Sequence, residues 1–90
     1  MKKHKKWKKD FLKTFFEVSN FCLKDKGELF IVHKPENLTE IIILATNNNL
    51  ELKLLQFITN SSNKAPSLFL AKFVKNGKTL LKLLPQKTIN

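Results

Sequence analysis

Apolar side chains recur every three or four residues from Asp10 onwards, as on one face of an α-helix. The stripe consists of Phe11, Phe15, Val18 and Cys22, widened by Leu12, Phe16 and Leu23. Asp10 is a favourable N-cap residue, and Asp25-Lys26-Gly27 is a typical stop signal. The pattern therefore predicts an amphipathic helix that begins at Asp10 and ends near Lys24.

A short apolar run and a second helical pattern follow. Glu28 to Val32 does not alternate cleanly between polar and apolar residues, which is typical of a strand covered on both faces. Pro35 suits the first position of a new helix. The helical spacing i, i+3, i+4, i+7 is met by Leu38, Ile41, Ile42 and Ala45, and the segment Asn47-Asn48-Asn49 ends it.

The pattern of polar and apolar residues in the second half of the chain predicts strands. Alternation begins at Leu50 and shifts phase at Leu55, which predicts a strand that has a bulge or becomes buried, followed by a polar loop from Thr59 to Lys64. Leu68 to Val74 is apolar apart from Lys72, so we expect it inside the sheet. Asn76-Gly77 is typical of a type I′ hairpin turn, and Leu80 to Leu84 would be the returning arm.

The order of helix, strand, helix, strand, strand and short final arm predicts an α/β fold. A helix between two strands of one sheet implies a right-handed crossover connection. A chain of 90 residues has room for one small domain of marginal stability.

Positive charge is concentrated at the start of the chain. All seventeen basic residues are lysine and the formal net charge is +10. Within residues 1–9 these are Lys2, Lys3, Lys5, Lys6, Lys8 and Lys9, which leaves a charge of +4 on residues 10–90 (10 − 6 = 4). We interpret residues 1–9 as a solvated basic tail, because adjacent lysines repel one another and oppose the positive end of a helix dipole.

The tail is a candidate RNA contact, with its lysines on phosphates and the Trp7 indole stacked on a base. The alternative is a tail without a specific role. Trp7 also lies four residues before Phe11, so it could extend the apolar stripe and cap the core instead.

The sequence offers no catalytic, cofactor-binding or metal-binding constellation. Its two glycines, Gly27 and Gly77, are too far apart for a phosphate-binding or dinucleotide-binding loop. His4, Cys22 and His33 match no metal-ligand spacing, and we expect Cys22 to be a buried, inert thiol of a chain in the reducing cytoplasm. A pair of Cys22 and His33 is the less favoured alternative. No apolar run reaches the roughly 18 residues of a membrane span.

A resemblance begins at Gly27 and runs to Ile41, where the sequence reads GELFIVHKPENLTEI. This segment is similar to the strand-to-helix junction of the bacterial tRNA(Val) adenine-N6 methyltransferase family, which typically shows a glycine, an apolar strand and then His-Arg-Pro-Glu-Arg-Leu. Residues 50–57 and 67–74 resemble the next two family strands, and Asn76-Gly77-Lys78 with residues 81–85 resembles its terminal segment. The match covers residues 10–90.

The chain departs from the family pattern at four polar positions. Lys34 and Asn37 replace arginines, Asn49 stands where glycine is common, and Ser67 stands where asparagine is common. Each departure weakens a polar feature and leaves the apolar frame intact.

The resemblance implies the carboxyl-terminal half, residues 10–90, of a Rossmann-like methyltransferase domain that uses S-adenosylmethionine. These residues would supply the last three strands and two helices of a seven-stranded sheet. The glycine-rich cofactor loop and the Asn-Pro-Pro-Tyr motif of the family have no counterpart here, since the chain has no tyrosine and no Pro-Pro pair. We therefore expect a truncated or split fragment, inactive alone, whose partners are tRNA and a separate amino-terminal half.

His33 and Lys34 follow the first strand, and ligands of α/β sheets bind beyond the carboxyl ends of strands. They are candidate RNA contacts, although a solvated junction that prepares Pro35 is the favoured interpretation. Two other function classes remain: a small basic RNA-binding α/β module without catalytic activity, and a membrane-surface module that uses Trp7 and the phenylalanine-rich helix. We expect the isolated chain to aggregate or to stay loosely folded, because surfaces made for the other half would be bare.

Overall fold

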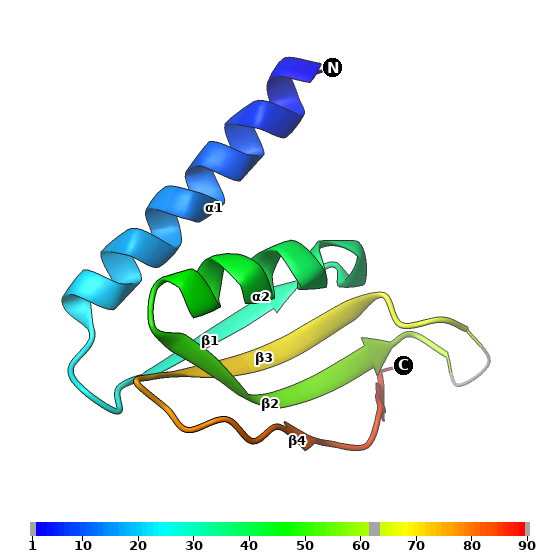
Figure 1. Ribbon diagram of the computed structural model, residues 1–90. Helices are drawn as coiled ribbons and strands as arrows, with labels where there is room; N and C mark the ends of the chain where they lie inside the picture. The colour runs from blue at the N-terminus through cyan, green and yellow to red at the C-terminus, as the bar shows by residue number, and fades with distance from the viewer. Residues whose placement is uncertain (1, 62–63, 90) are drawn as a thin grey trace.

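The computed structural model describes residues 2–61 and 64–89, with side chains described from Asp10 onwards. The elements are α1 (Lys2–Cys22), β1 (Glu28–His33), the 3-10 helix η1 (Pro35–Asn37), α2 (Leu38–Asn47), β2 (Leu50–Thr59), β3 (Leu68–Lys75), β4 (Lys82–Leu83) and β5 (Lys87–Thr88). Figure 1 shows both α-helices on one side of a single sheet. The mixed α/β class predicted from the sequence is confirmed.

The first helix begins earlier than predicted. α1 starts at Lys2 and not at Asp10, so the backbone of the basic segment is helical almost throughout. Residues 2–9 contain neither proline nor glycine, and lysine has a good intrinsic helix propensity, so nothing interrupts the helix there. The division of the chain into a tail and a domain at residue 9 stays a prediction.

α1 also buries a different face from the one that the sequence favours. Phe16 is fully buried, and Leu12 and Leu23 pack against the core. The stripe that includes Phe11 and Val18 is exposed, and Cys22 is an exposed thiol rather than a buried one. The periodicity identified an apolar helix correctly, but α1 carries apolar residues on two sides and only one of them meets α2 and the sheet.

The strands follow the order β1-β3-β2-β4, with β5 also on β2, in the described part of the chain. β3 lies between β1 and β2 and is antiparallel to both, so β1 and β2 run parallel to each other. α2 connects these two strands across β3. The expected position of β3 inside the sheet is confirmed, and so is the bulge in β2, where the register shifts between Leu52 and Leu54.

The core lies between the helices and one face of the sheet. Alternate residues Phe69, Ala71 and Phe73 of β3 are fully buried against α1 and α2. The phenyl ring of Phe16 meets that of Phe73 edge-on at a centroid separation of 6.0 Å. We call the opposite side of the sheet the open face, because neither α1 nor α2 covers it.

β1 was expected to be covered on both faces, and this expectation is wrong. Its residues alternate in exposure, with Leu29 and Ile31 packed on the core and Phe30 and Val32 exposed on the open face. The reason is that α1 and α2 both cover the sheet from the same side. The unbroken apolar run is therefore real, but half of it has no cover from the described residues.

The hairpin expected at Asn76-Gly77 does not form. Asn76 has a positive φ of 56° but Gly77 does not, and a type I′ turn needs positive φ at both residues. The chain instead crosses to the far side of β2, where β4 and β5 pair in parallel. Both edges of β3 are already occupied by β1 and β2, so the outer edge of β2 is the free place for this segment. We call residues 78–89 the strap.

The end of α1 is tied to the end of β3. The Lys75 ammonium donates to the carbonyl oxygens of Asn20 and Leu23, the latter at 2.8 Å, and so neutralises the negative end of the α1 dipole. Lys75 also exchanges backbone hydrogen bonds of 2.9 Å with Lys26 and Gly27 in the turn that follows α1. No sequence pattern pointed to this role of Lys75.

Candidate functional site

The carboxyl ends of β1 and β2 meet at one edge of the sheet, because the two strands are parallel. This is the edge where α/β sheets bind ligands. His33 is the last residue of β1, and Lys34 follows it in extended backbone, as a residue before proline should. The structure therefore places His33 and Lys34 at the edge that the sequence predicts.

The His33 ring is used within the junction. Its Nδ1 accepts a hydrogen bond of 2.9 Å from the backbone N–H of Lys34 and lies 3.1 Å from the side-chain nitrogen of Asn37. The Nδ1 atom is therefore occupied within the junction by its own neighbours. The half-buried His33 thus fixes the turn into η1, which is the favoured junction role, while the exposed Lys34 side chain is free to meet a charged ligand.

Thr59 closes the carboxyl end of β2 and was not identified as a site residue from the sequence. Its fully buried hydroxyl donates to the carbonyl oxygen of Ser61 at 2.8 Å and lies 3.4 Å from those of Lys64 and Ala65. One hydroxyl proton satisfies one of these acceptors at a time. The Thr59 hydroxyl therefore holds the loop after β2 in place and does not act as a reactive group there.

The remaining candidate RNA contacts stand apart from this edge. Residues 2–9 belong to α1, and Figure 1 shows this end of the helix projecting away from the sheet. The side chains of Lys2, Lys3, Lys5, Lys6, Trp7, Lys8 and Lys9 lie outside the described part of the chain. Their backbone belongs to α1, whereas His33 and Lys34 lie at the end of β1.

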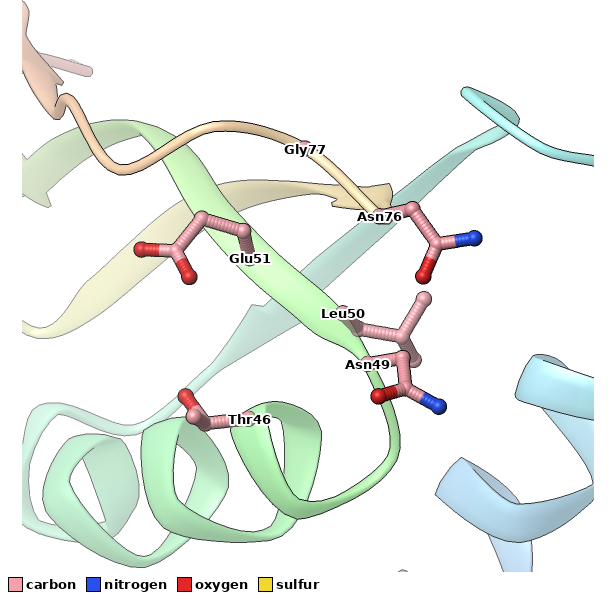
Figure 2. A pocket seen from close by; sticks show the side chains of 6 residues that line it. All are labelled: Thr46, Asn49, Leu50, Glu51, Asn76 and Gly77. Atoms are coloured by element: carbon pink, nitrogen blue, oxygen red, sulfur yellow. The ribbon is translucent and has the colours of Figure 1, made fainter.

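A shallow hollow of about 210 Å³ lies at the other end of β2. Figure 2 shows the side chains that line it, which are Thr46, Asn49, Leu50, Glu51, Asn76 and Gly77. They come from the end of α2, the start of β2 and the turn after β3. Its polar groups are amides, one hydroxyl and one carboxylate, and no nucleophile is paired with a base, so the hollow offers no catalytic arrangement.

Both glycines serve packing within the chain. A Cβ at Gly27 would lie 2.9 Å from the carbonyl oxygen of Lys24, and one at Gly77 would lie 3.1 Å from Cβ of Val74. Each glycine thus allows a close approach of backbone to neighbouring residues of its own turn. That the chain alone does not bind S-adenosylmethionine stays a prediction.

Among residues 10–61 and 64–89, whose side chains are described, histidine, cysteine and acidic side chains do not gather in groups of three or more that could hold a metal ion. None of the helices within residues 2–61 and 64–89 combines the length and the apolar character that crossing a membrane requires.

The structure superposes on the crystal structure of a predicted O-methyltransferase, protein Atu636 from Agrobacterium tumefaciens, with a TM-score of 0.78 and 13% sequence identity. The fold is methyltransferase-like. The match covers 86% of this chain and 36% of that chain, so the chain corresponds to about a third of its structural neighbour. No family model matches the sequence, and no curated protein does.

Proposed function

We propose that this chain forms the carboxyl-terminal part of an S-adenosylmethionine-dependent methyltransferase domain that modifies an adenine of tRNA at N6. The observation that carries the proposal is the superposition of 86% of the chain on part of a predicted O-methyltransferase. The choice of tRNA adenine rests on the sequence resemblance from Gly27 to Ile41, and not on the structural neighbour.

In this proposal the chain is a scaffold and an RNA-contacting part, inactive by itself. β1, β3 and β2 extend the sheet of the whole domain, and the exposed Lys34 beside His33 faces the edge where the substrate would lie. The cofactor loop and the group that holds the target amine come from the other part of the domain. S-adenosylmethionine, when bound there, supplies the methyl group.

The experiment has two arms that use the 90-residue chain. Calorimetry of the purified chain with S-adenosylmethionine should show no saturable binding, because its two glycines are too far apart in the sequence to form a glycine-rich cofactor loop. In the second arm, the chain is mixed with the amino-terminal part of a member of the tRNA(Val) adenine-N6 methyltransferase family. The mixture should transfer methyl groups to tRNA, and nucleoside analysis should find N6-methyladenosine.

Each part alone serves as the control and should give no product. Saturable cofactor binding by the chain alone would contradict the proposal. A complex that forms and binds the cofactor but leaves tRNA adenine unmodified would contradict the substrate.

The second candidate is a small basic RNA-binding module without catalytic activity. Six lysines within nine residues favour it, since lysine-phosphate contacts release counterions and give strong, salt-dependent binding. RNA binding by the chain alone, with affinity that the amino-terminal part does not change, would support this candidate instead.

A further inference from the structure

α1 has a second apolar side, away from the side that packs on the core. Phe16 is fully buried against the sheet, whereas four other apolar side chains of the helix are exposed: Phe11, Phe15, Val18 and Phe21. Residues three or four positions apart are neighbours on a helix surface, so these four side chains form one continuous strip. We call this strip the outer face of α1.

The outer face is exposed to an extent that apolar side chains seldom show together. Phe21 is 88% exposed and Val18 is 53% exposed, within one turn of each other. Apolar side chains that are exposed singly are ordinary, but a contiguous apolar patch marks a surface that binds a protein or a membrane. The outer face is therefore a docking surface, and its chemical surroundings decide what binds there.

The same helix carries the highest concentration of positive charge in the chain. α1 contains seven lysines against two acidic residues, Asp10 and Glu17, and six of these lysines fall within residues 2–9. Figure 1 shows this end of α1 projecting beyond the sheet. One helix thus combines an exposed apolar strip with a lysine-rich end, which is the composition of helices that lie in the surface of an anionic membrane.

Charge and apolar character together favour a lipid surface over two other occupants. A second copy of the chain has the same net charge of +10, so lysine-rich ends would repel one another. RNA offers phosphates to lysines and bases to aromatic rings, but it has no apolar phase for an aliphatic side chain such as Val18. An anionic bilayer supplies both the negative headgroups and the apolar phase.

We propose that the outer face of α1 docks on an anionic lipid surface, with the helix parallel to the plane of the membrane. Phe15, Val18 and Phe21 enter the boundary between headgroups and acyl chains, and the lysine-rich end of α1 is attracted to the anionic headgroups. The helix lies on the bilayer and does not cross it. The inference goes beyond the proposed function and does not depend on it.

The test is flotation of the 90-residue chain with vesicles on a density gradient, which recovers only protein that is bound to lipid. Vesicles of phosphatidylcholine and phosphatidylserine should carry the chain upwards, whereas vesicles of phosphatidylcholine alone should not, because each lysine gains about 1 kcal/mol near an anionic surface. Added salt should weaken the binding. Trp7 is the only tryptophan and lies four residues before Phe11, so its fluorescence should shift to shorter wavelength with the anionic vesicles.

Two double variants locate the contact. Val18→Ser with Phe21→Ser should weaken binding to the anionic vesicles about tenfold or more, because two apolar side chains no longer enter the lipid. Phe30→Ser with Val32→Ser is the matched control, since it makes the same two replacements on the open face, where these residues are 57% and 54% exposed. It should leave binding unchanged.

Circular dichroism checks that both double variants keep their helices. Phe21→Ser alone alters only the most exposed position of the strip and should weaken binding in the same direction. Equal flotation with neutral and anionic vesicles, equal losses in the two double variants, or no flotation of the unmodified chain would each overturn the inference. So would binding of tRNA, or formation of a dimer, that Val18→Ser with Phe21→Ser abolishes while flotation persists, because the outer face would then serve that partner.

Discussion

The structural role of Lys75 could not be inferred from its neighbours in the sequence. Its ammonium donates to two carbonyl oxygens, that of Asn20 in the last turn of α1 and that of Leu23 directly after the helix. A lysine near the end of a strand is usually a solvated charge, and its sequence neighbours give no sign of another function. The contact joins residues separated by more than half of the chain, which no local pattern encodes.

We expect Lys75→Met to lower the free energy of unfolding by about 1–2 kcal/mol, since it removes charge-assisted hydrogen bonds at the negative end of a helix dipole. The measurement is the urea midpoint followed by far-ultraviolet circular dichroism. Lys82→Met removes the same charge at an exposed position of β4 and should change stability by less than about 0.5 kcal/mol. Equal shifts of the two midpoints would show that Lys75 contributes only charge.

Asn49 links α2 to β2 with a positive φ of 64°. Asparagine tolerates this left-handed conformation, glycine adopts it without steric cost, and alanine does not. Asn49→Gly should therefore leave the melting temperature unchanged or slightly higher, whereas Asn49→Ala should cost about 1 kcal/mol, or about 4–8 °C in a domain of this size. The backbone oxygen of Asn49 accepts from Asn76 N at 2.8 Å in every variant, so the comparison isolates the dihedral angle. An alanine variant as stable as the glycine variant would contradict this explanation.

Among the candidate site residues, only His33 and Lys34 could be assigned a place from the sequence. Their position after an apolar strand was sufficient, because strand ends gather at one edge of a sheet. The hydrogen bonds of the His33 ring to Lys34 and Asn37 could not be predicted, since they depend on the turn into η1. The function of Thr59 in shaping the loop after β2 was missed for the same reason: it depends on the path of residues that follow it.

At the scale of the elements, two phenylalanines of α1 give a matched comparison. Phe16 is fully buried against Phe73, while Phe21 is 88% exposed. Phe16→Ala should cost about 3–5 kcal/mol and unfold a domain of marginal stability, but Phe21→Ala should cost less than about 0.5 kcal/mol. Far-ultraviolet circular dichroism and urea unfolding measure both. Similar losses for the two variants would mean that α1 packs through another face.

The elements that the sequence predicts well are those defined by local signals. β1, α2, β2 and β3 all appear close to their expected ranges, as does the bulge in β2, because periodicity and turn residues act over a few neighbours. The failures concern partners. Whether Phe16 or Phe11 is buried, and whether the strap pairs with β3 or β2, depends on which surfaces other elements already occupy. Asn76-Gly77 indicated a turn, but it could not indicate which strand the segment after the turn would pair with.

At the scale of the whole molecule, charge is separated from the packed sheet. Removing residues 1–9 takes away six of the net ten positive charges and should flatten the salt dependence of any RNA binding. The log-log slope should fall by about 0.7 for each lost single-strand phosphate contact. Filter binding of tRNA between low and physiological salt measures this slope.

Trp7→Ala keeps every lysine and is the control for stacking. If the indole stacks on a base, Trp7→Ala should weaken the binding free energy by about 1–3 kcal/mol without changing the slope of the salt dependence. An unchanged slope after removal of residues 1–9 would place the phosphate contacts on residues 10–90.

The central position of β3 has a consequence for synthesis on the ribosome. β1 and β2 pair with β3 and not with each other, and β3 is the last long strand to be made. During translation, β1 and β2 therefore emerge as apolar segments before any sheet can form. Pairing of Glu28 with Val74 must wait until Val74 has been synthesised and has left the ribosome. A nascent chain of this kind folds late and exposes unpaired strands in the meantime, so its strand order alone raises the risk of aggregation during synthesis.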